Sequence, residues 1–440
     1  MNSVTSQIEY IFKIEDLDLF KQKAFAWASP FPLISYLDSN QYQQDTPHSY
    51  EGLIAVGQQA TLIKSADDTS VNAFDQLKAL HQQTQDWLFG FMAYDLKNEV
   101  ERLSSKNEDH IGLPDLLFFQ PEIVIEIFEK QVAIHSKTIL PGAIFEQIEM
   151  TKPLKVQAIA KKPDVKARLS KEYYLESVEA IRQHIIEGDI YEMNFCQEFF
   201  AEAYDMDAEQ LFLLLNKIGK APFTAFVKWQ DKYLCCASPE RYIKKVGNQL
   251  ISQPIKGTIK RGQTPEEDAQ LRDMLSKSEK DKAENVMIVD LVRNDLARSC
   301  KAGSVKVDEL FGIYAYEQVH HMISTISGEL RDDVHFVDAI RNAFPMGSMT
   351  GAPKVMSMQL IEHYEKSRRG LYSGAVGYIR PNGDFDFNVV IRSVLYNAAA
   401  KYLSFQVGGA IVFNSVPDLE YEECMLKAKG ILTALGLREN

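Results

Sequence analysis

The 440-residue sequence has few cysteines, no long apolar run and no excess of basic residues. Its five cysteines are scattered without CxxC spacing, which argues against a zinc site and a disulfide framework and favours a reducing cytoplasm. No apolar stretch approaches the length of a membrane span, and the N-terminus lacks the basic and apolar regions of a secretory signal. With 61 acidic and 48 basic residues the net charge is −13, which argues against nucleic acid as the main partner. We therefore expect a cytoplasmic protein that binds neither nucleic acid nor membrane, although local cations could still hold a small anionic substrate.

One composition shift divides the chain. Residues 151–170 are rich in lysine, contain two prolines and predict an exposed connector between an N-terminal α+β part, 1–150, and a larger part, 171–440. The larger part opens with a marked helix that Ser170 can cap and Gly188 can terminate. Strand and helix patterns do not alternate strictly, so we predict an α+β fold with large antiparallel sheets.

Two acidic helices are candidates for a metal site. "EKDKAENVMIVDLVRNDLA" places Asp281 and Glu284 on one face, and "PDLEYEECMLKAKGIL" places Glu420 and Glu423 on one face with Lys427 one turn further. Carboxylates on two facing helices could hold Mg²⁺. The alternative for either helix alone is a solvated acidic surface.

Two glycine-containing segments could bring backbone amides to a ligand. "FPMGSMTGAPK" does not have the spacing of a phosphate loop and predicts instead a turn before a helix, which exposes Ser348 and Thr350. "QVGGAIV" follows a strand pattern, and its small residues allow close approach of the backbone. Glycine in such places often serves only the turn.

Three charged or titratable side chains stand out in strand patterns. The adjacent histidines of "VHHMISTISGEL" should point to opposite faces, so one of them can enter a given site. Arg392 is predicted on an otherwise apolar strand, where it needs an anionic partner in the protein or in a ligand.

The stretch "SQPIKGTIKRG" places Lys256 at a turn, sixteen positions after Glu240. If the intervening chain turns back, the two side chains flank one pocket. A nucleophilic lysine must be neutral, which demands burial or cationic neighbours. The alternative is a solvated surface lysine.

Several segments occur together in the order and spacing of one known family: "SPERY", "PIKGT", "AENVMIVDLVRNDLARSC", "VHHMISTISG", "GSMTGAPK", "YSGAVGYI", "VVIRS" and "EYEECMLKA". In these segments the chain resembles the chorismate-utilising enzymes, strongly over residues 170–440 and weakly before them. The resemblance implies a sandwich of large antiparallel sheets with surrounding helices, and an Mg²⁺-dependent reaction of chorismate.

Lys256 separates the members of this family. Anthranilate synthases usually have alanine at this place, whereas the aminodeoxychorismate synthases have the lysine, which is thought to attack C2 of chorismate. The resemblance therefore implies component I of an aminodeoxychorismate synthase, in the pathway to p-aminobenzoate and folate, with anthranilate synthase component I as the alternative. A relative that only binds chorismate or a partner is a further alternative, against which the retained acids argue. Two departures are Glu192, where amine-adding relatives mostly have glutamine, and Ala410, where a second glycine is usual.

The resemblance also implies roles for individual residues. Lys256 would be the nucleophile and Glu240 the general acid, with His321 as a third catalytic candidate. Glu284 and Glu423 would bind Mg²⁺, supported by Asp281 and Glu420. The remaining substrate-binding candidates are Thr258, Ser304, Ser348, Tyr372, Arg392, Gly408, Ala410 and Lys427.

Two further ligands are implied in the same way. Family members take ammonia from a separate glutamine amidotransferase subunit, component II, and no cysteine here stands in the context of a glutaminase nucleophile. The N-terminal segment "SPFPLISYLDSN" falls where relatives bind tryptophan.

Overall fold

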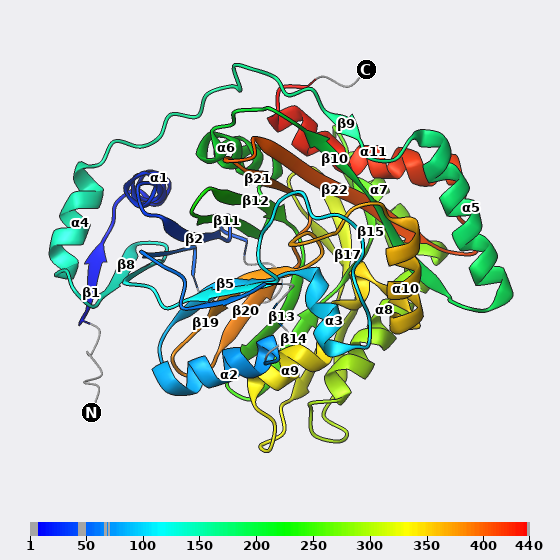
Figure 1. The fold of residues 1–440 in the computed structure, drawn as a ribbon, viewed down its shortest axis with the longest axis horizontal. Helices are drawn as coiled ribbons and strands as arrows, with labels where there is room; N and C mark the ends of the chain where they lie inside the picture. Colours follow the sequence, from blue (N-terminus) through cyan, green and yellow to red (C-terminus); the bar gives the residue numbers. More distant parts are fainter. Residues whose placement is uncertain (1–7, 43–49, 66–67, 69–70, 438–440) are drawn as a thin grey trace.

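Two large antiparallel β-sheets form the framework of the molecule (Figure 1). The structure is a computed structural model that describes residues 8–42, 50–65, 68 and 71–437. We call the 12-stranded sheet sheet I and the 10-stranded sheet sheet II. The predicted α+β sandwich is confirmed.

In spatial order, sheet I consists of β1 (Ile8–Lys13), β8 (Gln131–Ser136), β7 (Ile123–Ile127), β3 (Gly52–Gly57), β2 (Leu33–Asp38), β11 (Phe223–Trp229), β12 (Lys232–Ser238), β21 (Ser393–Asn397), β22 (Tyr402–Ile411), β10 (Glu192–Ala201) and β18 (Gly351–Ala352), with β9 (Lys166–Ala167) beside β10. Sheet II consists of β15 (Ile255–Lys260), β17 (Val319–Glu329), β14 (Gln249–Gln253), β13 (Arg241–Val246), β20 (Phe385–Asn388), β19 (Ala375–Ile379), β5 (Leu88–Met92), β6 (Leu116–Phe119) and β4 (Leu62–Lys64), with β16 (Lys306–Ala315) beside β17.

Helices cover the outer faces of both sheets. The core on sheet I is shared with α1 (Leu17–Ala28), α4 (Pro141–Met150), α5 (Lys171–Glu187), α6 (Ala208–Gly219), α10 (Lys354–Tyr364) and α11 (Pro417–Ala434). The core on sheet II is shared with α2 (Ala73–Thr84), α8 (Glu279–Ala297) and α9 (Phe336–Ala343). The shorter helices η1 (Tyr94–Leu96), α3 (Lys97–Val100) and η2 (Gly347–Met349) and the more exposed α7 (Pro265–Lys277) complete the set.

A third apolar core lies between the sheets. It joins Leu33 and Val227 of sheet I to Phe89, Leu117 and Val376 of sheet II. Apolar side chains therefore join the two inner faces, and the layers are helices, sheet I, sheet II and helices. Apolar residues on both faces of a strand are what two covered sheets require.

The N-terminal and C-terminal parts contribute strands to the same two sheets. β2 pairs with β11 in sheet I, and β5 pairs with β19 in sheet II. Residues 152–159 between the parts have no regular secondary structure, and only the short β9 and its pairing with β10 follow before α5. The connector thus separates two parts of the chain whose strands share sheets.

Local signals in the sequence agree with the elements. Ser170 caps α5 by accepting from the Tyr173 amide at 3.1 Å, and Gly188 ends the helix with φ of 86°. The predicted strand through Arg392 is interrupted, however, and Arg392 has φ of 52°. The chain leaves sheet II after β20 and enters sheet I at β21, so residues 389–392 cross between the sheets.

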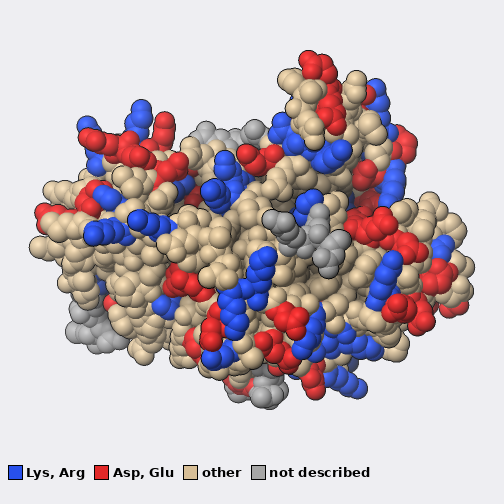
Figure 2. Space-filling view, turned by 90° about the horizontal axis from the view of Figure 1, so that it is seen from above, with Lys and Arg blue, Asp and Glu red and all other residues tan. Residues whose placement is uncertain are grey.

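On the face drawn in Figure 2, acidic and basic side chains of the described residues are interspersed, and neither sign forms a continuous surface. Within the described part of the chain, no helix combines the length and the apolar character needed to cross a membrane.

Candidate active site

The predicted site lies where an edge of sheet I meets an edge of sheet II. β22, β10 and β18 end the strand order of sheet I, and β15 is the terminal strand of sheet II. α8 packs on β15, and α11 packs on β22. Lys256 on β15 lies close enough to both acidic helices to act on their carboxyl groups: it opposes the rise in the pKa of Glu284 on α8 and contributes to the lowered pKa of Glu423 on α11. The two acidic helices therefore converge, as predicted.

A β-bulge places Lys256. The pairing of β15 with β17 shifts register between Ile255 and Thr258, which leaves Lys256 and Gly257 outside the regular ladder. Gly257 has φ of 93°, and a Cβ there would lie 3.0 Å from the Cβ of Asp281. Only glycine fits this backbone and this approach to α8 comfortably. The lysine is thus held inward rather than exposed on a turn.

Lys256 is paired with the carboxylate of Glu192. Its Nζ lies 2.5 Å from Oε1 of Glu192, and the two residues are 9% and 1% exposed. Burial lowers the pKa of Lys256, but the carboxylates of Glu192, Glu284 and Glu240 outweigh that effect and raise it above its ordinary value. The lysine is thus buried, which is one of the two conditions that a neutral lysine requires. Its neighbours are anionic, so in the free enzyme it is an ammonium ion.

The β13–β14 hairpin turns the chain back, and Glu240 lies close enough to Lys256 for the lysine to act on its pKa. The side chain is 4% exposed, and burial raises its pKa to about 7, against the opposing effects of the Ser348 hydroxyl and Lys256. A carboxyl group with such a pKa can be a proton donor near neutrality. A pocket is lined by Glu240 and Ser348 together with Val292 and Asp295 of α8.

The acids of α8 and α11 differ in environment. Burial raises the pKa of Glu284 to about 7, and the neighbouring Glu192 and Asp281 add to that effect. Glu420 accepts from the Ser415 hydroxyl at 2.7 Å, and burial raises its pKa. Glu423 lies 2.7 Å from Lys427, which lowers its pKa.

The strand β22 meets α11 through its glycines. Lys427 donates to the carbonyl oxygen of Gly408 at 2.9 Å. A Cβ on Gly409 would lie 3.6 Å from Oε2 of Glu420, Oε1 of Glu423 and Nζ of Lys427 alike. The backbone of Gly408, Gly409 and the partly buried Ala410 therefore lies next to the acidic side chains of α11.

Arg392 and Tyr372 lie on the same side as Lys427. Tyr372 is 4% exposed, and its hydroxyl lies 3.4 Å from Sγ of Cys196, which pairs with Gly408. Burial lowers the pKa of Arg392, while Tyr372 and Glu423 act against that effect. No described residue makes a hydrogen bond or ion pair with the guanidinium, so this partly buried cation is available to an anionic ligand.

His321 and Thr258 face each other across β17 and β15, with 2.8 Å between Nδ1 and Oγ1. Burial lowers the pKa of His321 to about 3, and the nearby Arg392 adds to this, so the imidazole is neutral. His320 points away and lies 2.9 Å from Asp268. The prediction that only one histidine faces the site is confirmed.

Ser304 is not part of this group, and its predicted place in the pocket is wrong. Its hydroxyl donates to the Lys301 carbonyl at 2.8 Å and accepts from the Glu329 amide at 3.1 Å. Glu329 ends β17, eight residues after His321, which is about 26 Å along a strand. The α8–β16 turn that carries Ser304 therefore lies at the far end of sheet II. Thr350 is unavailable as well, because its hydroxyl bonds to backbone carbonyls of its own turn.

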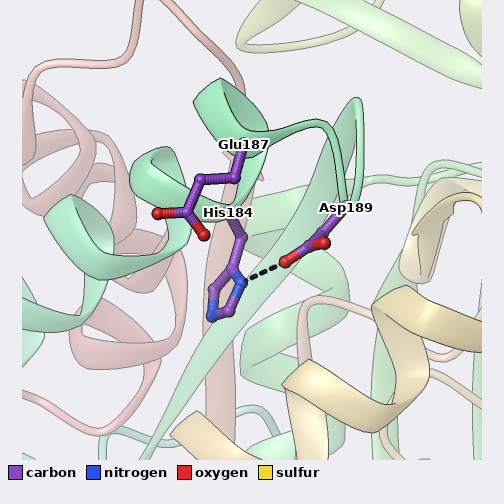
Figure 3. A group of neighbouring side chains, drawn as sticks. All are labelled: His184, Glu187 and Asp189. Atoms are coloured by element: carbon purple, nitrogen blue, oxygen red, sulfur yellow. Dashed lines mark hydrogen bonds and ion pairs between the residues drawn. The ribbon is translucent and has the colours of Figure 1, made fainter.

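A separate group of possible metal ligands lies at the end of α5. Among the described residues, His184, Glu187 and Asp189 form the group whose potential ligand atoms all lie within 4.8 Å of one another (Figure 3). His184 Nδ1 lies 2.8 Å from Asp189, and Nε2 lies 3.1 Å from the Tyr364 hydroxyl. Both ring nitrogens are therefore engaged, and this cluster needs no ion.

Sequence reasoning missed three residues of the site. Glu192 was noted only as a departure, yet its carboxylate holds Lys256. Lys280 lies 3.9 Å from Glu284, and its charge also acts to lower the pKa values of Glu420 and Glu423. Gly409 faces three charged groups. The spacing of Lys280 and Glu284, one helical turn, was a signal for the second of these.

Comparison with known proteins gives one family. The family model described as chorismate binding enzyme matches residues 34–433. Aminodeoxychorismate synthase component 1 of Bacillus subtilis is 32% identical over 407 residues, which cover 86% of each chain. Anthranilate synthase component 1 of Thermus thermophilus is 34% identical over 362 residues, 80% of this chain and 77% of that one. A probable chloroplastic aminodeoxychorismate synthase of rice is 47% identical over 264 residues, but these are 59% of this chain and only 29% of the plant protein.

The fold has close structural relatives. The crystal structure of anthranilate synthase component I from Streptococcus pneumoniae superposes with a TM-score of 0.74 over 98% of this chain and 93% of that one, at 23% identity. Identity at that level speaks for the fold alone. Together with the family match over residues 34–433, which include every site residue described above, these findings show that the chain belongs to the chorismate-binding enzyme family.

Proposed function

We propose that this chain aminates chorismate to 4-amino-4-deoxychorismate, the role named in its relatives called aminodeoxychorismate synthase component 1. The observation that carries the proposal is Lys256, buried at the meeting of the two sheets beside the acid Glu240. A surface lysine would need neither the bulge nor the glycine that hold it there. Alanine at this place would leave no nucleophile.

Cations of the site suit a dianionic substrate. Arg392 has no hydrogen-bond or ion-pair partner for its guanidinium among the described residues, and Lys427 is shared between Glu423 and a backbone carbonyl. Each could take one carboxylate of chorismate, and Tyr372 lies beside Arg392. Even partial burial of a cation without a counter-ion is costly, so a bound anion would relieve the cost.

The reaction divides between a nucleophile and an acid. Neutral Lys256 would attack C2 while the bond between C4 and its hydroxyl breaks, and Glu240 would give its proton to the departing oxygen, which leaves as water. Ammonia would then attack C4 and expel the lysine from C2. The neutral His321, bonded to Thr258, would line the pocket near Arg392.

The acids of the two helices fit Mg²⁺. Glu284 and Glu423 would be ligands, with Glu420 and Asp281 in support, because oxygen donors are what this ion prefers. Burial is the main cause of the raised pKa values of Glu284 and Glu420, and neighbouring carboxylates add to it, so a bound cation would favour their ionised forms. When bound, the ion would neutralise a substrate carboxylate and this cluster together. Since the acids do not gather three ligand atoms within 4.8 Å in this structure, water and substrate would complete the coordination.

A partner subunit would supply the ammonia. All five cysteines are buried, and burial raises the pKa of each thiol. A glutaminase needs an accessible thiolate, so we propose that a separate glutamine amidotransferase, component II, delivers ammonia in the cytoplasm. Tryptophan binding at β2 stays a proposal as well. There Asp38 is already paired with Lys21 at 2.9 Å, and Asn40 bonds to Asn216.

Anthranilate synthesis is the second candidate, because the Thermus thermophilus relative is as similar as those named for amination. One assay separates the two. Incubation with chorismate, Mg²⁺ and ammonium should give an aminated chorismate without pyruvate. Release of stoichiometric pyruvate with a fluorescent aromatic product would instead establish the second candidate. No turnover despite chorismate binding would indicate a relative that only binds.

A further inference from the structure

Glu192 is a buried carboxylate that makes a single polar contact with the site. Oε1 lies 2.5 Å from Nζ of Lys256, and the contact joins β10 of sheet I to β15 of sheet II. Oε2 is buried and has no hydrogen-bond partner among the described residues. Two lone-pair sites on that oxygen are therefore free inside the protein, which is an unusual state for a carboxylate.

The backbone around Glu192 is fixed. Glu192 pairs with Ala352 across β10 and β18, and the Ser357 hydroxyl donates to its carbonyl oxygen at 3.2 Å. Gly351 allows this approach, because a Cβ there would lie 2.1 Å from the same oxygen. The carboxylate is therefore presented to Lys256 from a rigid strand rather than from a loop.

We propose that Glu192 is the general base that removes the proton from Lys256 and returns it when the lysine departs. The inference rests on the proposed amination and assigns the step that this chemistry leaves open, since the lysine is an ammonium ion in the free enzyme. Glu192 contacts the reacting nitrogen itself, within the distance required of a base.

The other carboxylates near Lys256 come from other elements and lie further from its Nζ atom. Glu284 and Asp281 face it from α8, Glu423 from α11, and Glu240 from the chain before β13. Among the described carboxylates, only that of Glu192 lies within 4.0 Å of Nζ. Glu240 must carry a proton at the start of the reaction, so it cannot also accept one from the lysine.

The proposed cycle balances. In the first half, the bond from Lys256 Nζ to C2 forms, the C4–O bond breaks, the lysine proton passes to Glu192 and the Glu240 proton leaves in water. In the second half, ammonia bonds to C4 and the C2–N bond breaks. Glu192 then returns its proton to the departing amine, and the new C4 ammonium group gives a proton to Glu240. At the end of the cycle Glu192 is again ionised and Glu240 is again protonated.

The test is Glu192→Gln in the full chain. The carboxamide keeps the size and an acceptor oxygen but cannot take the proton. We expect kcat with chorismate, Mg²⁺ and ammonium to fall about 100-fold, the usual contribution of a general base, while KM for chorismate changes little. Formation of the Lys256 adduct, followed by peptide mass spectrometry, should slow by the same factor. The residual rate should rise more steeply with pH than in the parent, because the proton must then go to solvent.

A matched control lies on the same face of β10. Glu198 is 3% exposed and six residues further, and its carboxylate is paired with Arg168, Tyr402 and Ser404. Glu198→Gln should leave kcat and its pH profile unchanged. Thermal unfolding of both variants reports the fold. If Glu192→Gln does not fold, Glu192→Asp keeps a base one methylene further back and should retain the parental pH profile at reduced kcat.

Two results would overturn the inference. If Glu192→Gln equals or exceeds the parent in kcat, then Glu192 only raises the pKa of Lys256 and removes no proton. If the Asp variant is no faster than a folded Gln variant, the carboxylate is not a base. A parent enzyme that releases pyruvate would instead refute the amination itself, and that result is read on the parent alone.

Discussion

A lysine buried among carboxylates is an ammonium ion at rest, and Lys256 is such a residue. If it is the nucleophile, chorismate trapped before amination should add covalent mass to the peptide that contains it. Lys256→Ala should abolish this adduct, because a methyl group has no lone pair to offer. The variant should still bind chorismate and Mg²⁺, and direct attack of ammonia at C2 should shift its product toward anthranilate with pyruvate release.

Peptide mass spectrometry and a pyruvate assay check both expectations. Lys260, which lies on the same strand, offers a control as Lys260→Ala, which should behave as the parent. An unchanged rate and product in Lys256→Ala would remove the main support for amination.

Glu240 gives the reaction a pH dependence of known sign. Its pKa is about 7 because of burial, so the acid form dominates below pH 7 and is lost as the pH rises. A general acid must start protonated, so the rate of adduct formation in single turnovers without ammonium should fall above about pH 7. In Glu240→Gln the rate should be lower by about 100-fold, and this fall should be absent. A parent rate that keeps rising through pH 8 would contradict the assignment of Glu240 as the acid.

At the scale of elements, the contact of β15 with α8 is set by one glycine. Gly257→Ala should destabilise the fold by about 1–3 kcal/mol, since φ is 93° and the new Cβ would lie 3.0 Å from Asp281. Because β15 must shift away from Asp281 to make room for the new Cβ, Lys256 should be displaced as well, and kcat should fall by more than 10-fold. Chemical denaturation and steady-state kinetics measure the two effects.

Gly247 is the matched control in the β13–β14 turn. Its φ is also positive, at 57°, but a Cβ there would meet no atom within 4 Å. Gly247→Ala should lower the free energy of unfolding through the same unfavourable backbone conformation, but it should keep full activity. Equal activities of the two variants would mean that the bulge does not position the lysine.

The facing of α8 and α11 leads to a prediction about the metal. Glu423→Gln removes one proposed ligand but leaves a side chain that is exposed, so the fold should be intact while Mg²⁺-dependent activity is lost. Activity titrated against Mg²⁺, with circular dichroism as the fold control, checks this. Glu422→Gln, on the neighbouring exposed position, should titrate as the parent. Near-normal turnover of Glu423→Gln at low Mg²⁺ would show that the metal is held elsewhere.

Sequence patterns predicted the features that depend only on residues close together along the chain. The caps of α5, the acid pairs three residues apart and the opposed histidines follow from helix and strand periodicity, and the structure has them. The contact of Glu192 with Lys256 spans 64 residues and joins strands of different sheets, so periodicity could not reveal it. The place of Ser304 was implied by the family resemblance alone, and its hydrogen bonds to Lys301 and Glu329 put it at the other end of β17.

At the scale of the whole molecule, the shared sheets make the N-terminal part necessary to the framework. β2 and β3 lie between β7 and β11 in sheet I, and β5 pairs with β19 in sheet II. Removing residues 8–150 would expose the apolar core between the sheets, which both parts build. The catalytic groups, all after residue 190, therefore depend on strands that carry none of them.

The source of nitrogen is the last property that belongs to the whole chain. With glutamine alone the purified chain should make no product, because its five thiols are buried and their raised pKa values keep them protonated. With ammonium it should make product, and the rate should rise with the concentration of free ammonia as the pH increases, until loss of the Glu240 proton opposes the gain. Holding free ammonia constant across the pH series separates these two effects. Glutamine-dependent turnover by the chain alone would show that it hydrolyses the amide itself and would remove the need for a partner subunit.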